Sequence, residues 1–367
     1  MRGAADSRCR GRTMPPKPRV LVTGAGGFIG GRAVEVLHQL GYDVRAGVRR
    51  WSSAARIGRL PIDIVPCDLT DTRQLDAACN GVSAIVHCAV NLQSLPDAER
   101  QMRNLLDAAA RHHLGRFVHL STMEVYGEPP GDIDEGHALD SAGGHSHYAR
   151  LKIRLEAVCR EYIACGQPIV ILRPTIVYGP FSESWTVEVA QRLLSSSWSL
   201  PEQATQGTCN LVYIDDLVAA VLLALHDTGA VGEAFNINGA ERLTWNDYFR
   251  ALGRALGVAR LQRRGALTAR AGAWLTLPVR KSAKFLLHRY QDQVMGVYQR
   301  SRLARQIMRR AERVLRQVPT PQEFRLCSRT AFYVTDKAAR LLGYRPRFST
   351  ERGVGLSAAW LKHEGYA

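Results

Sequence analysis

The sequence predicts an α/β fold built on a doubly wound parallel sheet, with a smaller, mainly helical part interleaved along the chain. Two observations carry that prediction. Short apolar runs alternate with helical segments through the first half of the 367 residues, and this alternation is typical of parallel strands joined by right-handed crossovers. A glycine-rich turn also separates the first apolar run from the first helical segment, as in sheets that bind nucleotides at that point.

The expected strands are short and rich in apolar residues. They are Arg19–Thr23, Tyr42–Val48, Ile62–Pro66, Ala84–Cys88, Arg116–Ser121, Ile169–Arg173 and Ala234–Asn238. Helical segments lie between them, including Phe28–Leu40, Ser146–Cys165 and the clearest of them, Asp97–His113. Ligands of open parallel sheets bind beyond the carboxyl ends of the strands, so site residues are expected there.

The glycine turn is the most informative stretch of the chain, and its spacing from Gly24 to Gly30 is GxxGxxG. Gly24 permits the turn, Gly27 lets the backbone approach a pyrophosphate, and Gly30 lets the helix pack closely on the strand. The helix N-terminus, at Phe28 and Ile29, attracts the phosphates. A glycine turn before a helix also suits a plain loop, so the rest of the chain has to decide.

A tyrosine and a lysine then follow in a YxxxK pattern, at Tyr148 and Lys152, inside the helix expected over Ser146–Cys165. Positions i and i+4 share a helix face, so the phenol and the ammonium can point at one site. Upstream, the strand expected over Arg116–Ser121 ends in two hydroxyls, with Thr122 as the second.

In this order, the glycine turn, the hydroxyl and the YxxxK pattern resemble the extended subclass of the short-chain dehydrogenase/reductase superfamily, which includes NAD-dependent epimerases and dehydratases. Further motifs match at Ile85–Ala89, Val125–Gly127, Leu172–Pro180 and Val212–Leu217. The resemblance covers about residues 18–258 and returns at 331–366. It implies a Rossmann-type NAD(P)-binding domain over 18–180 plus about 210–240, and a substrate-binding part over about 181–209 and 241–367.

The resemblance also implies a role for each residue of the trio. Tyr148 would be the general acid/base, and Thr122 would anchor the substrate oxygen, with Ser121 a less favoured substitute. A free tyrosine, with a pKa of about 10, is a poor base at neutral pH. Lys152 would lower the pKa of Tyr148 and hold the nicotinamide ribose. The residues expected to contact the cofactor are Gly24, Gly27, Phe28, Ile29, Gly30, Arg49, Asp68, Leu69, Cys88, Ala89, Tyr148, Lys152 and Pro174.

Cofactor choice depends on the end of the second expected strand. NAD-preferring members place an acidic residue there, which bonds the ribose hydroxyls. This chain has Arg49, and a guanidinium suits a 2′-phosphate by bidentate contact. NADP(H) is therefore the preferred cofactor. The alternative is NAD(H), with Arg49 or Arg50 stacked on adenine. Asp68 and Leu69 resemble the pair that contacts adenine.

Three departures from nucleotide-sugar enzymes bear on the substrate. Met123 stands where dehydratases carry an acid, and a thioether donates no proton for water loss. Ile176 replaces an asparagine near the diphosphate, and Cys209-Asn210 stand where an arginine often pairs with it. The sequence around 173–180 and 210–217 is closer to the 3β-hydroxysteroid dehydrogenase and dihydroflavonol reductase branches, and the apolar run Ala271–Leu277 suits a pocket wall or an ordinary buried helix.

The favoured function is therefore hydride transfer between NADP(H) and a hydrophobic ketone or secondary alcohol. The enzyme alternative is a nucleotide-sugar epimerase or reductase. The alternative from another class is a non-catalytic dinucleotide-binding subunit or sensor, although such a protein has no need of the trio.

The net charge of +16 is concentrated in two segments, because residues 1–19 carry +5 and residues 280–316 carry +9. The rest is nearly neutral, which argues against a nucleic-acid partner. Residues 1–17 are expected to be a disordered basic tail, and Met14 is a second candidate start. The basic amphipathic insertion 280–316 suits either a helix packed on the substrate domain, which is favoured, or peripheral membrane contact.

The eight cysteines form no CxxC pair and no cysteine–histidine cluster with zinc-ligand spacing, so no metal site is expected. Reduced thiols and the lack of an apolar run of membrane-spanning length indicate a cytoplasmic protein, with membrane association through 280–316 as the variant. By analogy with the superfamily, a homodimer would form through the helices at Asp97–His113 and Ser146–Cys165.

Overall fold

The computed structural model of the chain describes residues 17–92, 94–140, 146–195, 205–258 and 320–367. The elements, in chain order, are β1 (Arg19–Thr23), α1 (Phe28–Gln39), β2 (Asp43–Val48), η1 (Trp51–Ala54), β3 (Asp63–Pro66), α2 (Thr72–Cys79), β4 (Ala84–His87), α3 (Leu95–Arg111), β5 (Arg116–Leu120), η2 (Met123–Tyr126), β6 (Asp132–Ile133), α4 (His147–Ala164), β7 (Ile169–Pro174), β8 (Ile176–Tyr178), η3 (Glu183–Val187), α5 (Glu188–Leu194), β9 (Thr208–Cys209), β10 (Leu211–Tyr213), α6 (Ile214–His226), η5 (Thr228–Ala230), β11 (Ala234–Ile237), β12 (Leu243–Thr244), α7 (Trp245–Ala255), α11 (Pro321–Ser328), β13 (Phe332–Tyr333), α12 (Asp336–Leu341) and α13 (Thr350–His363).

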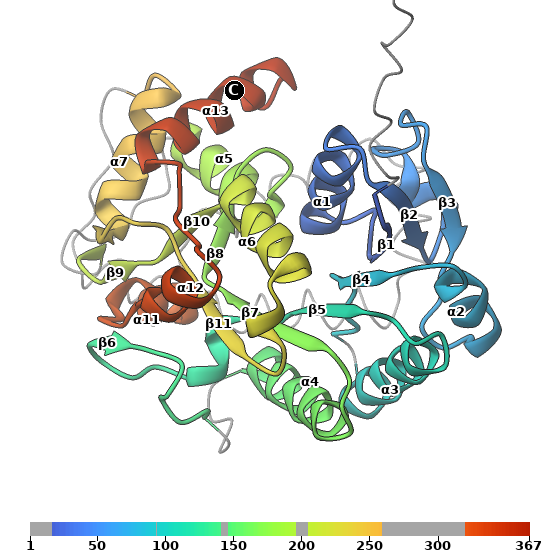
Figure 1. Cartoon of the computed structure of the whole chain (residues 1–367). Helices are drawn as coiled ribbons and strands as arrows, with labels where there is room; N and C mark the ends of the chain where they lie inside the picture. Colours follow the sequence, from blue (N-terminus) through green and yellow to red (C-terminus); the bar gives the residue numbers. More distant parts are fainter. Residues whose placement is uncertain (1–16, 93, 141–145, 196–204, 259–319) are drawn as a thin grey trace, which may run out of the picture. The chain divides into compact units, whose positions relative to one another are not determined.

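The main sheet has seven strands in the order β11-β7-β5-β4-β1-β2-β3 and flanking helices, which confirms the predicted Rossmann-type α/β fold (Figure 1). Two compact units share the chain: Met1–Val118 with Ala164–Pro168, and His119–Ile163 with Ile169–Ala367. β5 begins in the first unit and ends in the second. The division into a cofactor part and a substrate part is a functional one and stays a prediction.

In the first unit, β1 lies between β2 and β4, and both pairs are parallel. β3 extends this part of the sheet beside β2, and α1 packs across β1 and β2 (Figure 1). The strand order therefore reverses between β1 and β4. Their ends are joined by a hydrogen bond between the Thr23 hydroxyl and His87 Nδ1, at 2.7 Å. The crevice at such a reversal is where open α/β sheets bind ligands.

The third helix begins two residues earlier than the sequence predicted, at Leu95, and ends at Arg111. Ser94 is its N-cap and accepts a hydrogen bond from the Asp97 N–H at 3.3 Å. Pro96 fits the first turn, where its missing N–H costs nothing. The predicted start at Asp97 was wrong because the capping serine lies upstream of the acidic residue. The other predicted strands and helices agree with the structure to within one residue at each end.

A buried ion pair organises the core of the second unit. Arg173 on β7 donates to both carboxylate oxygens of Glu156 on α4, at 2.9 and 2.6 Å. It also donates to the Tyr126 hydroxyl at 2.7 Å, which in turn donates to Asn236 Oδ1 on β11 at 2.7 Å. Ser121, after β5, donates to Glu156 at 2.5 Å. Every member is buried, so the network fixes β5, η2, α4, β7 and β11 against one another.

A second buried network, of amides, joins the short strand pairs of this unit. Asn238 Nδ2 donates to Asn210 Oδ1 and to the Tyr333 carbonyl, both at 3.0 Å. Asn210 Nδ2 donates to the Ala331 carbonyl at 2.9 Å, and Thr175 donates to Asn238 Oδ1 at 2.9 Å. These bonds hold the β8–β10 pair next to the segment that forms β13.

Two expectations from the sequence fall outside the described residues. They are the basic amphipathic insertion 280–316 and the apolar run Ala271–Leu277. Of the predicted basic tail, 1–17, the structure describes only Lys17. The Lys17 ammonium donates a hydrogen bond to the Leu40 carbonyl at 2.6 Å.

Candidate functional site

The glycine turn has the backbone that its sequence predicts. Gly24 has a φ of +68°, and a Cβ there would lie 2.8 Å from the Ala89 nitrogen. A Cβ on Gly30 would lie 2.3 Å from the Gly24 carbonyl oxygen, so Gly30 allows helix α1 to pack onto the turn itself. At Gly27 an added Cβ meets only the Gly24 carbonyl, at 3.2 Å. The turn is thus tight on its inner side and open at Gly27.

A cavity of about 560 Å³ lies at the reversal of strand order between β1 and β4. It brings together seven of the predicted cofactor residues, which are Gly24, Gly27, Arg49, Asp68, Leu69, Cys88 and Ala89. Its volume is in the range of small-molecule sites. Phe28, Ile29 and Gly30 form the start of α1 behind the turn. Tyr148, Lys152 and Pro174 belong to the second unit, on α4 and at the end of β7.

The N-terminus of α1 fits a phosphate ligand. Gly27 is its N-cap, no side chain caps it, and its first turn holds no acidic residue. By contrast, Asp71 caps α2 and Ser94 caps α3 with side-chain oxygens. The first N–H groups of a helix need acceptors, and a phosphate supplies them together with a charge that the helix dipole favours. The cavity residues therefore fit a dinucleotide held at its pyrophosphate.

The end of β2 supplies positive charge and hydroxyls to the same cavity. Arg49 and Arg50 are exposed and line it, followed by Ser52 and Ser53 of η1. Asp68 also lines this cavity, and its carboxylate accepts hydrogen bonds from the Thr70 N–H and hydroxyl. These bonds, with a smaller contribution from Arg49, hold the pKa of Asp68 below its ordinary value. Asp68 is therefore a carboxylate at neutral pH.

The three residues predicted to be catalytic lie within the second unit. Thr122, after β5, is 7% exposed and caps η2, accepting a hydrogen bond from the Glu124 N–H at 3.3 Å. Its hydroxyl also makes a hydrogen bond with the phenol of Tyr148 on α4. Lys152, one turn further along α4, is 5% exposed, and its ammonium donates to the Leu120 carbonyl at 2.6 Å. The trio predicted from the sequence is thus drawn together by β5, η2 and α4.

Burial raises the pKa of Tyr148 above its ordinary value. The hydrogen bond with Thr122 lowers that pKa by less, and the Glu124 carboxylate raises it further. Tyr148 is therefore a protonated phenol at neutral pH, suited to donating a proton. The predicted lowering of this pKa by Lys152 stays a prediction.

Glu124 is in turn paired with an arginine from the C-terminal part of the chain. Arg329, after α11, donates to Glu124 at 2.8 Å and to Glu128 at 2.7 Å. Burial acts to lower the pKa of Arg329, but the Glu124 and Glu128 carboxylates raise it by more. The net effect is a raised pKa, so Arg329 is positively charged at neutral pH. The sequence did not indicate this pair, since 205 residues separate its members and no motif links them.

The structure also places the residues that bear on the substrate. Ser121 donates to Glu156, which leaves Thr122 as the hydroxyl beside Tyr148. Met123 and Ile176 are each 5% exposed. Cys209 is fully buried, and the side-chain amide of Asn210 is used by internal hydrogen bonds.

Several residues that line the first-unit cavity were not predicted. They are Gly26, Val48, Ser52, Ser53, Cys67, Val90, Asn91 and Gln101, whereas Arg50, which also lines the cavity, was named as a residue that could stack on adenine. A Cβ on Gly26 would lie 2.3 Å from the Ser53 carbonyl, so η1 packs directly on the turn. The available signal was the polar run Arg49–Ser53 immediately after a predicted strand.

The comparison with known proteins agrees with this geometry. Residues 20–238 match the family model of the NAD-dependent epimerase/dehydratase family. The chain belongs to this family. Its fold and its glycine turn are therefore those of an NAD-dependent enzyme family, as the resemblance implied.

Relatives of this family member differ in the substrates that their names state. Sterol demethylase protein B of Methylococcus capsulatus is 29% identical over 229 residues, 60% of this chain and 69% of that protein. An uncharacterised UDP-glucose epimerase of Bacillus subtilis is 29% identical over 257 residues, 61% of this chain and 78% of that protein. Among solved structures, UDP-glucuronic acid 4-epimerase of Bacillus cereus in complex with NAD has a TM-score of 0.71 at 20% identity, covering 95% of this chain and 100% of the other.

Two features are absent from the described residues. No helix among them is long and apolar enough to cross a membrane. Within the same part of the chain, no group of three or more histidine, cysteine, aspartate or glutamate side chains is placed to hold a metal ion.

The glycine turn gives a first prediction. We expect Gly24→Ala to abolish measurable NADPH and NADH binding, because a Cβ there meets the Ala89 backbone at 2.8 Å and shifts the turn. Cofactor fluorescence titration measures the loss. Gly41→Ala is the matched control, since its φ of +79° imposes similar strain while nothing lies within 4 Å. Equal losses in both variants would assign the effect to backbone strain alone.

The surroundings of Tyr148 give a second prediction. Glu124→Gln removes a charge that raises the pKa of Tyr148, so the phenol should ionise at lower pH than in the parent chain. Carbon-13 NMR of ζ-labelled tyrosine, assigned with Tyr148→Phe, follows that ionisation. Glu128→Gln removes the other carboxylate held by Arg329 and should leave the titration in place. An unchanged midpoint in Glu124→Gln would contradict the prediction.

Proposed function

We propose that the chain is an NADP(H)-dependent oxidoreductase that transfers a hydride between the cofactor and a hydrophobic ketone or secondary alcohol. The observation that carries this proposal is the pairing of Thr122 with Tyr148, with Lys152 buried one turn further along α4. A protein that only binds a dinucleotide has no need of this trio. The binding-only alternative is therefore less favoured.

The proton chemistry of the proposed reaction belongs to Tyr148. Its phenol gives a proton to the carbonyl oxygen during reduction and takes it back from the alcohol during oxidation. Thr122 hydrogen-bonds the same oxygen and orients it. Lys152 is held by the Leu120 carbonyl, and its positive charge stabilises the phenolate that remains. When bound, NADP(H) supplies or accepts the hydride.

The preference for NADP(H) rests on the end of β2. Arg49, Arg50 and Ser52 line the same cavity as the glycine turn, with no acidic residue at the position that closes this strand. Guanidinium groups bind phosphate oxygens in a bidentate manner, and a hydroxyl adds a further donor. NAD(H) remains the alternative, with an arginine stacked on the adenine.

The proposed apolar substrate rests on the residues that stand where nucleotide-sugar enzymes carry an acid or contact the diphosphate. The side chains of Met123 and Ile176 carry no group that hydrogen-bonds a phosphate. The Asn210 amide is engaged, since it donates to the Ala331 carbonyl and accepts from Asn238. The relative named as a sterol demethylase protein supports an apolar substrate. The relative named as a UDP-glucose epimerase supports the alternative, a nucleotide-sugar epimerase or reductase.

A substrate panel tests the proposed function. We expect NADPH oxidation with steroid-like or flavonoid-like ketones and no conversion of UDP-sugars. Tyr148→Phe should lower turnover by roughly 10²- to 10⁴-fold, the usual contribution of a positioned acid/base. Tyr162→Phe, also on α4, is the control and should keep full turnover. UDP-sugar conversion would favour the epimerase alternative, and cofactor binding without any turnover would favour the binding-only one.

Cofactor preference gives a separate prediction. Arg49→Glu should lower the ratio of NADPH to NADH affinity by about tenfold or more, because a charge-assisted hydrogen bond contributes about 1.5–3 kcal/mol. Fluorescence titration with both cofactors measures the ratio. Arg73→Glu changes an exposed arginine of the same unit outside the cavity and should leave the ratio unchanged. A parent chain that prefers NADH would overturn the assignment.

A further inference from the structure

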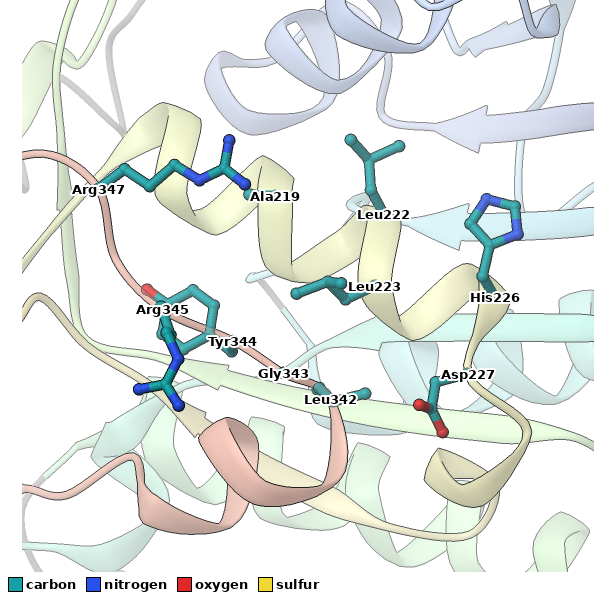
Figure 2. A pocket seen from close by; sticks show the side chains of 10 residues that line it. All are labelled: Ala219, Leu222, Leu223, His226, Asp227, Leu342, Gly343, Tyr344, Arg345 and Arg347. Atoms are coloured by element: carbon teal, nitrogen blue, oxygen red, sulfur yellow. The ribbon is translucent and has the colours of Figure 1, made fainter.

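A second cavity, of about 650 Å³, lies in the second unit between α6 and the loop that follows α12 (Figure 2). It shares no lining residue with the cavity at the glycine turn, and none of Thr122, Tyr148 and Lys152 lines it. The proposed reaction therefore makes no use of it. Its volume is in the range of pockets that hold a small organic molecule.

The loop that forms one wall is firmly held. Gly343 turns the chain with a φ of +68°, and Tyr344 is buried with its hydroxyl donating to the Asn238 carbonyl at 3.0 Å. Further on, the N–H groups of Arg347 and Phe348 donate to the Asp216 carboxylate at 2.7 and 3.2 Å. The backbone between these two anchors is fixed, so its side chains are presented to the cavity from a rigid support.

Two arginines from this loop give the cavity a positively charged end. Arg345 and Arg347 are both exposed and both line it. In the part of the chain that the structure describes, neither guanidinium forms an ion pair with a carboxylate. The Asp216 carboxylate, which feels the charge of Arg347, is already occupied by the two backbone N–H groups. Guanidiniums that form no ion pair within the described residues, and that project from a fixed loop, favour the binding of an anion.

The rest of the cavity is an apolar strip that ends in polar groups. Leu222 and Leu223 of α6 line it, with Leu342 from the loop (Figure 2). At the other end of this stretch of α6, Figure 2 shows His226 and then Asp227, away from the two arginines. The Asp227 carboxylate would repel an anion at its own end. The charge pattern therefore sets a direction, with the anionic group at the arginines and the apolar part along the leucines.

We propose that this cavity binds an amphipathic organic carboxylate, with its head group at Arg347 and an aliphatic chain on Leu222 and Leu223. Figure 2 shows the Arg347 guanidinium beside Ala219 on α6, and Arg345 adds positive charge from the same loop. Charge complementarity selects the anion, and burial of each methylene group of the chain against the leucines strengthens binding. The proposal goes beyond the proposed function, because the residues that line this cavity include none of the catalytic trio and none of the glycine turn.

Isothermal titration calorimetry on the full chain, with decanoate below its micelle concentration, tests the proposal. Decanoate should bind, while acetate, with the same charge and no tail, and decanol, with the same tail and no charge, should bind at least tenfold more weakly. Higher salt should weaken decanoate binding, because the arginines are exposed. Equal binding of decanol and decanoate would overturn the role of the arginines.

Matched variants locate the binding. The double change Arg345→Gln and Arg347→Gln should raise the dissociation constant for decanoate at least tenfold. Arg254→Gln removes an exposed arginine of α7 that does not line the cavity, and should leave binding unchanged. Binding that survives the double change, in a chain with unaltered melting temperature, would place the carboxylate elsewhere and refute the proposal.

A photoreactive analogue gives an independent readout. A decanoate that carries a terminal diazirine should label the peptide around Leu222 and Leu223, where the end of the tail is expected. Excess decanoate should suppress this labelling. Labelling confined to peptides outside 219–227 and 342–347 would contradict the assigned site.

Discussion

The buried ion pair between Arg173 and Glu156 is the interaction on which the arrangement of the predicted catalytic residues depends. It is nearly inaccessible to solvent and bonds in turn to Ser121 and Tyr126, which stand on either side of Thr122 in the sequence. Removing one partner of such a pair costs about 3–5 kcal/mol, because a charge is then left buried alone. That is a large part of the roughly 5–15 kcal/mol by which proteins are stable.

The same pair explains how α4, which carries Tyr148 and Lys152, is aligned. Glu156 lies one turn beyond Lys152 on α4, so fixing Glu156 to β7 also fixes the rotation and height of the helix that carries Tyr148. Lys152 adds a second point of attachment at the Leu120 carbonyl. Tyr148 and Thr122 are thus brought together by Arg173 and Glu156, which take no part in the proposed chemistry, and by Lys152, which does. The Glu156 carboxylate also accepts the hydrogen bond of the Ser121 hydroxyl. Ser121 therefore stabilises the ion pair, while the adjacent Thr122 bonds Tyr148.

The first unit differs in that its cavity presents backbone N–H donors of α1 and the positive charge of Arg49, both suited to a ligand. Its glycine turn is packed on the inner side by Gly24 and Gly30, while the start of α1 carries no capping side chain. The reversal of strand order between β1 and β4 opens the crevice at this point. Arg49 then supplies positive charge at the end of β2, where family members that prefer NAD carry an acid.

Much of the fold was readable from the sequence, because its signals are local. Apolar runs of strand length and the helices between them gave elements that agree with the structure almost to the residue, and the helix start at Leu95 was missed only because a serine cap lies upstream. The glycine turn was equally readable, since a left-handed residue and a close backbone approach both demand glycine. The cavity residue Asn91 was not, since nothing in its own neighbourhood marks it, and Ser52 was indicated only by its place in the run Arg49–Ser53 after a predicted strand.

The sequence by itself determined the strands, the glycine turn and the residue types of the trio, because each leaves a local pattern: alternating apolar and helical runs, glycine spacing, and a YxxxK motif. Only the tertiary structure decided which hydroxyl stands beside Tyr148, what charge surrounds it and which loop faces α6. Those answers depend on partners far apart in sequence, such as Glu124 with Arg329 and Asp216 with Arg347. Such pairs leave no periodic or local pattern, since their geometry exists only once the strands and helices have packed.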